Sequence, residues 1–180
     1  MKKLIIGAIV GSLILFIWQF LSWAMLDLHG SQMDHTPQQD AIMEAINNSG
    51  LEEGDYFMPR APRGASSEEA QAVMETAEGK PWALVKYRKT MKSQMGLNMF
   101  RGWAICLVSV LLLGWLLGQF AEVNLKKAII AAVSIGIIGY LTVPYLNSIW
   151  FEGNSMPDLI DAIVPWAATG AWLGWWIPRE

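Results

Sequence analysis

Two aspartates carry the strongest chemical signal in the chain. Asp158 and Asp161 stand three residues apart, so one face of a helix presents both carboxylates. Two carboxylates at this spacing can share a proton. No nucleophile or metal-anchoring group accompanies them, and the sequence has no Ser/His/Asp constellation, HExxH, P-loop or GxGxxG motif. The sequence therefore favours a non-enzymatic protein over an intramembrane acid–base enzyme.

Other polar residues are expected at the same membrane depth as these aspartates. Ionisable groups near hydrocarbon are costly and usually paired. Arg101 is the only cation of the group, and one hypothesis is an ion pair between Arg101 and Asp161. In the alternative, the aspartates cap the positive end of the last helix and Arg101 reaches lipid phosphate. We interpret the group as a candidate binding cluster of Asp27, Arg101, Asn147, Asp158 and Asp161.

Both histidines, His29 and His35, follow the first apolar stretch. With neighbouring carboxylate and thioether side chains they offer ligands for copper or another transition metal. Their spacing is not a zinc motif, and an ordinary solvated loop is the alternative. The single cysteine, Cys106, excludes an internal disulfide and a cysteine-based metal site. We expect no cofactor, unless a transition metal binds His29 and His35.

The elements that position these residues are four apolar stretches. Hydrophobic residues make up 53% of the 180 residues and charged residues only 16%, against about 25% in typical domains. This composition argues against a soluble or a disordered chain. The net charge of −3 gives no global attraction for nucleic acid. We expect transmembrane helices at residues 4–26, 99–120, 128–149 and 158–178, each near the length of about 20 residues that spans a bilayer.

A polar insert, residues 27–98, separates the first two helices. It contains two predicted strands, 55–58 and 82–88, and a helix that opens on a capping box from Ser66 to Glu69. An insert of this size buries little surface alone and is expected to lean on the helices. The predicted fold is an all-α membrane protein, a four-transmembrane-helix bundle with a small α+β extramembrane insert between helices 1 and 2.

Charge in the short loops predicts the orientation of the bundle. Lys2, Lys3, Lys126, Lys127 and Arg179 lie at one set of helix ends, which the positive-inside rule places in the cytoplasm. We therefore expect a multi-pass protein of the bacterial inner membrane, with both termini inside and residues 27–98 periplasmic. The basic stretch 80–92 would favour the reverse topology if counted alone.

Small residues are expected where the helices pack closely. Glycines recur at every fourth position in three helices, which lets helix backbones approach. Packing within the bundle explains them more economically than packing against a partner. Gln19 and Ser22, on the first helix, are expected to hydrogen-bond across the bundle. The expected packing glycines are Gly7, Gly11, Gly114, Gly118, Gly170 and Gly174.

One segment carries a resemblance to other proteins. Residues 18–29, WQFLSWAMLDLH, resemble the end of the first helix in a group of small, uncharacterised bacterial inner-membrane proteins with a WxxxSW…LxxH segment. Residues 55–59 and 147–151 are similar to later segments of that group. A proline usually precedes Trp-His there, whereas Asp27-Leu28 stands here. The resemblance implies a bacterial inner-membrane location and a four-helix layout, and no activity.

These observations favour an accessory or assembly subunit of a larger bacterial inner-membrane complex. Its expected partners are membrane lipids and other integral membrane proteins. The alternative is a component that binds or transports a metal, a lipid or a small solute through the outer polar cluster.

Overall fold

The computed structural model describes residues 2–178 and divides the chain into two compact units. Unit 1 runs to Asp34 and resumes at Gln94, and unit 2 is His35–Ser93. The chain is 67% helical, with one small two-stranded sheet. Residues 27–34 and 94–98, assigned from the sequence to the insert, therefore belong with the helices.

Unit 1 is built from four long helical stretches. Three of them, Lys2–Met25, Met95–Leu117 and Leu125–Phe151, are long and apolar enough to cross a membrane. The last stretch is not among these, and its sequence includes aspartates, prolines and several tryptophans, all of which have low hydropathy. The elements are α1 (Lys2–Phe20), α4 (Met95–Leu117), α5 (Leu125–Tyr140) with its continuation α6 (Leu146–Phe151), and α7 (Met156–Trp176).

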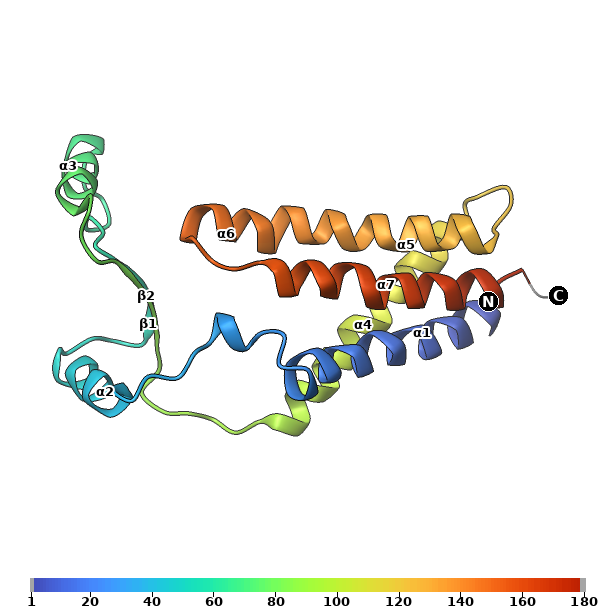
Figure 1. Ribbon diagram of the computed structural model, residues 1–180, viewed down its shortest axis with the longest axis horizontal. Helices are drawn as coiled ribbons and strands as arrows, with labels where there is room; N and C mark the ends of the chain where they lie inside the picture. Colours follow the sequence, from blue (N-terminus) through green and yellow to red (C-terminus); the bar gives the residue numbers. More distant parts are fainter. Residues whose placement is uncertain (1, 179–180) are drawn as a thin grey trace. The chain divides into compact units, whose positions relative to one another are not determined.

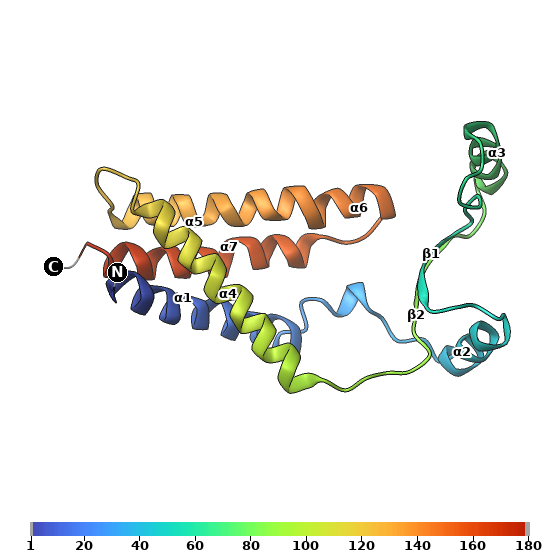
Figure 2. The ribbon, with the colours of Figure 1, turned by 180° about the vertical axis from the view of Figure 1, so that it is seen from behind.

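Helix α7 is the centre of unit 1. It packs against α5 on one side and α1 on the other, and α4 packs against α1. Figure 1 shows α5, α7 and α1 side by side, and Figure 2 shows α4 running diagonally across them. The core is made of small and aliphatic side chains from all four helices, namely Ala8, Leu15, Cys106, Val110, Leu113, Leu117, Ala128, Ala132 and Leu173.

Two helices widen into a single π-helical turn. Helix α1 continues as the π turn Leu21–Met25, and α5 passes into α6 through the π turn Leu141–Tyr145, which contains Pro144. Proline lacks the N–H that a regular α-helical turn uses, so the hydrogen-bond pattern must change there. Inserted π turns often lie at functional sites, and the turn Leu21–Met25 leads directly into the site described below.

The expected packing glycines lie mostly at helix–helix contacts. A Cβ on Gly7 would lie 2.9 Å from Cδ1 of Trp176, and one on Gly11 would lie 2.8 Å from Cγ1 of Val110. A Cβ on Gly174 would lie 2.8 Å from Cβ of Ala128, and a Cβ on Gly114 would overlap the Leu4 side chain. A Cβ on Gly118 would instead meet the backbone of its own helix. Small residues therefore set the close approach of α1 and α5 to α7.

Unit 2 alternates two helices with two strands. The predicted strands are confirmed, and they pair antiparallel from Gly54 opposite Tyr87 to Met58 opposite Ala83. Figures 1 and 2 show α3 at one end of this ribbon and α2 at the other. The elements in order are α2 (Gln39–Asn48), β1 (Gly54–Met58), α3 (Ser67–Ala77) and β2 (Ala83–Tyr87).

The capping box that the sequence predicts at the start of α3 is confirmed. The backbone N–H of Glu69 donates to Oγ of Ser66 at 3.1 Å, and the backbone N–H of Ser66 donates to Oε2 of Glu69 at 2.8 Å. Two N–H groups that the helix leaves unpaired are thereby satisfied. Local sequence alone therefore fixes where α3 begins.

We predict that Gly170→Ala destabilises unit 1, because the new Cβ would lie 2.8 Å from the Ala128 carbonyl oxygen and from Cβ of Ala132. Overpacking of this kind costs about 1–3 kcal/mol. The matched control is Gly139→Ala on α5, where a Cβ meets nothing within 4 Å. The control should unfold at the same or a higher temperature in detergent. Equal unfolding temperatures for both variants would contradict the packing described here.

Candidate functional site

The carboxylate of Asp161 is the centre of a polar network at one end of unit 1. Its Oδ1 accepts hydrogen bonds from Nε1 of Trp18 at 2.8 Å and from Oγ of Ser22 at 2.7 Å. Its Oδ2 lies 3.0 Å from Nε2 of His29. Trp18 lies near the end of α1 and Ser22 in the π turn that continues it, so one carboxylate of α7 joins α1 and the segment that follows it.

The network fixes the protonation of His29. The side-chain N–H groups of Gln32 donate to the backbone carbonyl of Asn154 and to Oδ2 of Asp158, both at 2.7 Å. The Gln32 carbonyl oxygen is thereby turned toward Nδ1 of His29, at 2.7 Å. Both ring nitrogens of His29 therefore face oxygen atoms, and with Asp161 ionised both nitrogens donate. We therefore interpret the site as an imidazolium paired with the Asp161 carboxylate.

Stacking on Trp23 completes the environment of the imidazolium. The two ring centroids lie 4.0 Å apart, and the ring planes differ by 4°. A cation over the face of a tryptophan ring is attracted by the electron-rich face. The His29 side chain is only 3% exposed, whereas that of Asp161 is 22% exposed. The histidine is therefore the buried member of the pair and Asp161 the partly accessible one.

The surroundings raise the pKa of His29 above its ordinary value of 6.5. Burial is the largest single influence and lowers the pKa, because it disfavours the charged ring. Hydrogen bonds to Gln32 and Asp161, and the negative charges of Asp161 and Asp158, together outweigh burial. The upward shift of the His29 pKa agrees with the geometry, in which both ring nitrogens face oxygen atoms.

Local backbone geometry turns the chain so that His29 reaches α7. The π turn ends with Leu26 N–H donating to the Leu21 carbonyl at 2.8 Å, and Leu28 N–H donates to the Ser22 carbonyl at 3.0 Å. Between them Asp27 takes a left-handed conformation with φ of 48°, which aspartate tolerates better than most residues. The short 3-10 helix Gly30–Gln32 then places Gln32 beside His29.

The Asp27 side chain packs against the backbone at Gly30, so a larger residue at position 30 would have to displace it. A Cβ at Gly30 would lie 2.7 Å from Oδ2 and 2.8 Å from Oδ1 of Asp27, so the carboxylate lies directly against this backbone.

The start of α7 supplies the other half of the site. Asp158 lies in its first turn and Asp161 one turn later, where the positive end of the helix dipole favours negative charge.

A small cavity of about 130 Å³ adjoins Asp161 between α1, α4 and α7. It has polar as well as apolar walls, and the Cys106 thiol is part of them. A space of this size holds a few water molecules, which occupy about 30 Å³ each in the liquid. Its lining residues are Leu15, Trp18, Gln19, Ile105, Cys106, Ser109, Asp161, Pro165 and Trp166.

The structure brings together only part of the polar cluster expected from the sequence. Asp158 and Asp161 share the His29 network, and Asp27 lies on the turn just before it. Arg101 and Asn147 are exposed. Within residues 2–178, no ion pair joins Arg101 to Asp161, whose charged partner is His29. In the alternative, the aspartates cap the last helix and Arg101 reaches lipid phosphate; Asp158 lies in the first turn of α7, and the lipid contact of Arg101 stays a prediction.

The metal hypothesis for His29 and His35 gains no support from this geometry. Both ring nitrogens of His29 are engaged by Gln32 and Asp161, which leaves no lone pair for a metal. His35 belongs to unit 2, whereas His29 belongs to unit 1. Over the part of the chain that the structure describes, no three or more His, Cys, Asp or Glu residues gather in a group able to hold a metal ion.

Sequence reasoning missed Trp18, Trp23 and Gln32 as members of the site. Ser22 was expected to hydrogen-bond across the bundle, and it does so with Asp161. Trp18 could have been assigned to the site from the sequence, because it stands four residues before Ser22 and therefore lies on the same helix face. Gln32 lies in an irregular turn, where spacing gives no such indication.

Comparison of the chain with protein-family models, with curated proteins and with solved structures finds no match. The resemblance of residues 18–29 to small inner-membrane proteins therefore stays a prediction. The segment itself is the one that forms the site, since it supplies Trp18, Ser22, Trp23 and His29.

We predict that the stability contributed by His29 depends on pH. Because the pKa of His29 is raised in the folded state, its contribution is complete below about 6.5 and is lost as the pH rises through the raised pKa. Thermal unfolding should therefore show the wild type losing its advantage over His29→Gln as the pH rises above the ordinary histidine pKa of 6.5 and through the raised pKa of His29.

Asn48→Gln, at an exposed position of α2 that carries no titratable group, is the control and should follow the wild type at each pH. A gap between wild type and His29→Gln that stays constant over the whole pH range would contradict a charged His29.

Proposed function

We propose that this chain is a non-enzymatic accessory or assembly subunit of a larger bacterial inner-membrane complex, and that unit 2 docks on a partner protein. The observation that carries the proposal is the lack of a core in unit 2. Among residues 35–93, Tyr87 alone is buried. Its hydroxyl donates to Oδ1 of Asn47 at 2.7 Å, which ties β2 to α2.

A unit with so little buried surface gains little from the hydrophobic effect. Even a compact domain of about 60 residues is marginally stable, and an isolated two-stranded sheet is weaker still. Unit 2 instead leaves large apolar side chains in contact with solvent. These are Ile42, Met43, Met58, Met74, Trp82, Leu84 and Met91.

Two grooves on unit 2 collect much of this apolar surface. One, of about 750 Å³, lies between α3 and the adjacent strand ends and includes Met58, Val73 and Trp82. The other, of about 820 Å³, lies between α2 and β2 and includes Met43 and Leu84. A partner protein that filled either groove would supply the burial that unit 2 lacks.

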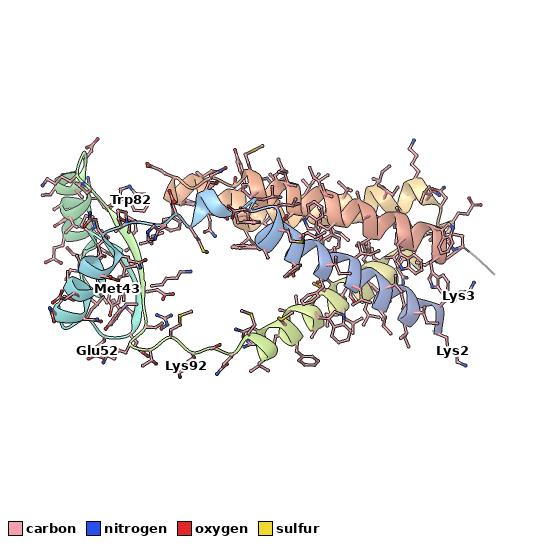
Figure 3. The ribbon with its side chains drawn as sticks, turned by 60° about the horizontal axis from the view of Figure 1, so that its bottom comes forward. Lys2, Lys3, Met43, Glu52, Trp82 and Lys92 are labelled. Atoms are coloured by element: carbon pink, nitrogen blue, oxygen red, sulfur yellow. The ribbon has the colours of Figure 1, made fainter. Side chains whose placement is uncertain are left out.

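The proposal includes four membrane spans with both termini in the cytoplasm. Helix α7 has 21 residues and is thus about 31 Å long, enough for a hydrocarbon core of about 30 Å. Figure 1 shows the N-terminus, the C-terminal end of α7 and the loop between α4 and α5 at one end of unit 1. Lys2 and Lys3 lie at this end (Figure 3), as do Lys126 and Lys127, which supports a cytoplasmic location for it.

The alternative function, binding or transport of a metal, lipid or small solute by the polar cluster, has weaker support. Asp161 and His29 direct their polar atoms at each other and at Trp18, Ser22 and Gln32. The adjoining cavity of about 130 Å³ is small for a ligand site, which commonly measures about 300–1,000 Å³. The network is better suited to hold helices together than to exchange a ligand.

We predict that the native assembly, extracted in a mild detergent and weighed by mass spectrometry, contains this chain in fixed stoichiometry with larger membrane subunits. The double variant Trp82→Ser/Leu84→Ser, which removes one apolar side chain from each groove, should be lost from the assembly. Met74→Ser is the control, because Met74 is 56% exposed but lines neither groove. A wild-type chain that is always extracted alone would contradict the proposed function.

A further inference from the structure

Strand β2 has one edge that no other strand covers. The sheet contains two strands in the order β1–β2, so each strand pairs along one edge only. In the described part of the chain, no backbone–backbone hydrogen bond outside the β1–β2 pairing involves residues 83–87. A row of unpaired N–H and carbonyl groups of this kind is a template for another strand.

A groove follows this edge of β2. Its volume is about 820 Å³, and consecutive residues Leu84 to Arg88 all line it. Successive residues of a strand point to opposite faces, so a groove that contacts all of them must run along the strand edge. Met43 and Ile46 of α2 form one wall, and Met91, after β2, extends the apolar surface. Met43 and Lys92 are labelled in Figure 3.

The groove carries an excess of positive charge. Its charged lining residues are Glu53, Lys86, Arg88 and Lys92. Arg88 is already paired with Asp55 at 2.8 Å, and Glu53 accepts a hydrogen bond from the Lys89 backbone at 2.9 Å. Among the described residues, Lys86 and Lys92 take part in no ion pair. Two lysines are therefore available to an acidic ligand.

We propose that this groove binds an extended, acidic segment of a partner protein, which adds to β2 as a third strand. The inference rests on the proposed function, which it deepens by naming the surface and the chemistry of the partner. Main-chain hydrogen bonds to the β2 edge would supply affinity. Apolar side chains on the face that the added strand shares with Val85 and Tyr87, which is the face toward α2, would cover Met43 and Ile46. Acidic side chains on its other face, which carries Leu84 and Lys86, would reach Lys86 and Lys92.

Charge argues against a second copy of this chain as the occupant. Parallel pairing of β2 with β2, or antiparallel pairing centred on Lys86, would bring Lys86 next to its own counterpart. Like charges in cross-strand positions are destabilising. Lysine on an exposed edge is also a common means by which proteins avoid pairing with themselves. An acidic segment meets none of this repulsion.

The test is a titration of the full-length protein, in nanodiscs of zwitterionic lipid, with a fluorescent peptide of alternating valine and glutamate. Fluorescence anisotropy should show saturable binding that weakens with added salt. The variant Lys86→Glu/Lys92→Glu should raise the Kd about tenfold or more, whereas Lys80→Glu, which changes a lysine of the other groove, should change it less than about twofold. A peptide with two valines replaced by proline should not bind, because proline cannot pair with the edge.

The inference is overturned if the peptide does not bind, if the proline peptide binds equally well, or if the Lys86→Glu/Lys92→Glu variant binds as wild type does. Binding of phosphatidylglycerol vesicles in place of the peptide, with the same lysine dependence, would also overturn it. A negative result in the peptide titration is distinguishable from failure of the proposed function. A Lys86→Glu/Lys92→Glu chain that still enters the native complex would show that docking occurs elsewhere.

Discussion

The ion pair between Asp161 and His29 is the interaction on which the arrangement of unit 1 depends. It brings a charged group of α7 together with a charged group beyond the end of α1, at a place where both are largely removed from water. A buried carboxylate without a partner would be expensive, and so would a buried imidazolium. Trp18, Ser22 and Gln32 satisfy the remaining polar atoms of the pair, so the charges are held without an orphaned donor.

The rest of the interface between α1 and α7 is consistent with an ion pair that joins them at one end. At the opposite end of the two helices, the indole N–H groups of Trp172 and Trp176 donate to the backbone carbonyls of Gly7 and Lys3, both at 2.9 Å. Glycine at positions 7 and 11 allows the close approach of α1 to its neighbours.

Unit 2 differs from unit 1, because it has almost no core. A well-packed helical unit joined to a unit with almost no core is the combination on which the proposed docking function rests.

Regular elements could be predicted from the sequence because their signals are local. The strands at 55–58 and 82–88 and the capping box at Ser66 follow from alternation, turn residues and caps. The four apolar stretches follow from hydropathy, although α7 falls below the composition that marks a span. The partner of Asp161 could not be predicted, because opposite charge alone pointed to Arg101. The choice of His29 depends on a π turn and a left-handed Asp27, which turn the chain toward α7 and have no simple sequence signature.

The central claim is that His29 is a cation held between Gln32 and Asp161. Nitrogen-15 NMR of the full-length protein with labelled histidine tests it most directly, because the two ring nitrogens of an imidazolium give nearly equal shifts and those of a neutral ring do not. His29→Gln assigns the signal. We expect an imidazolium spectrum for His29 at neutral pH. A neutral-ring spectrum there, with one protonated nitrogen, would contradict it.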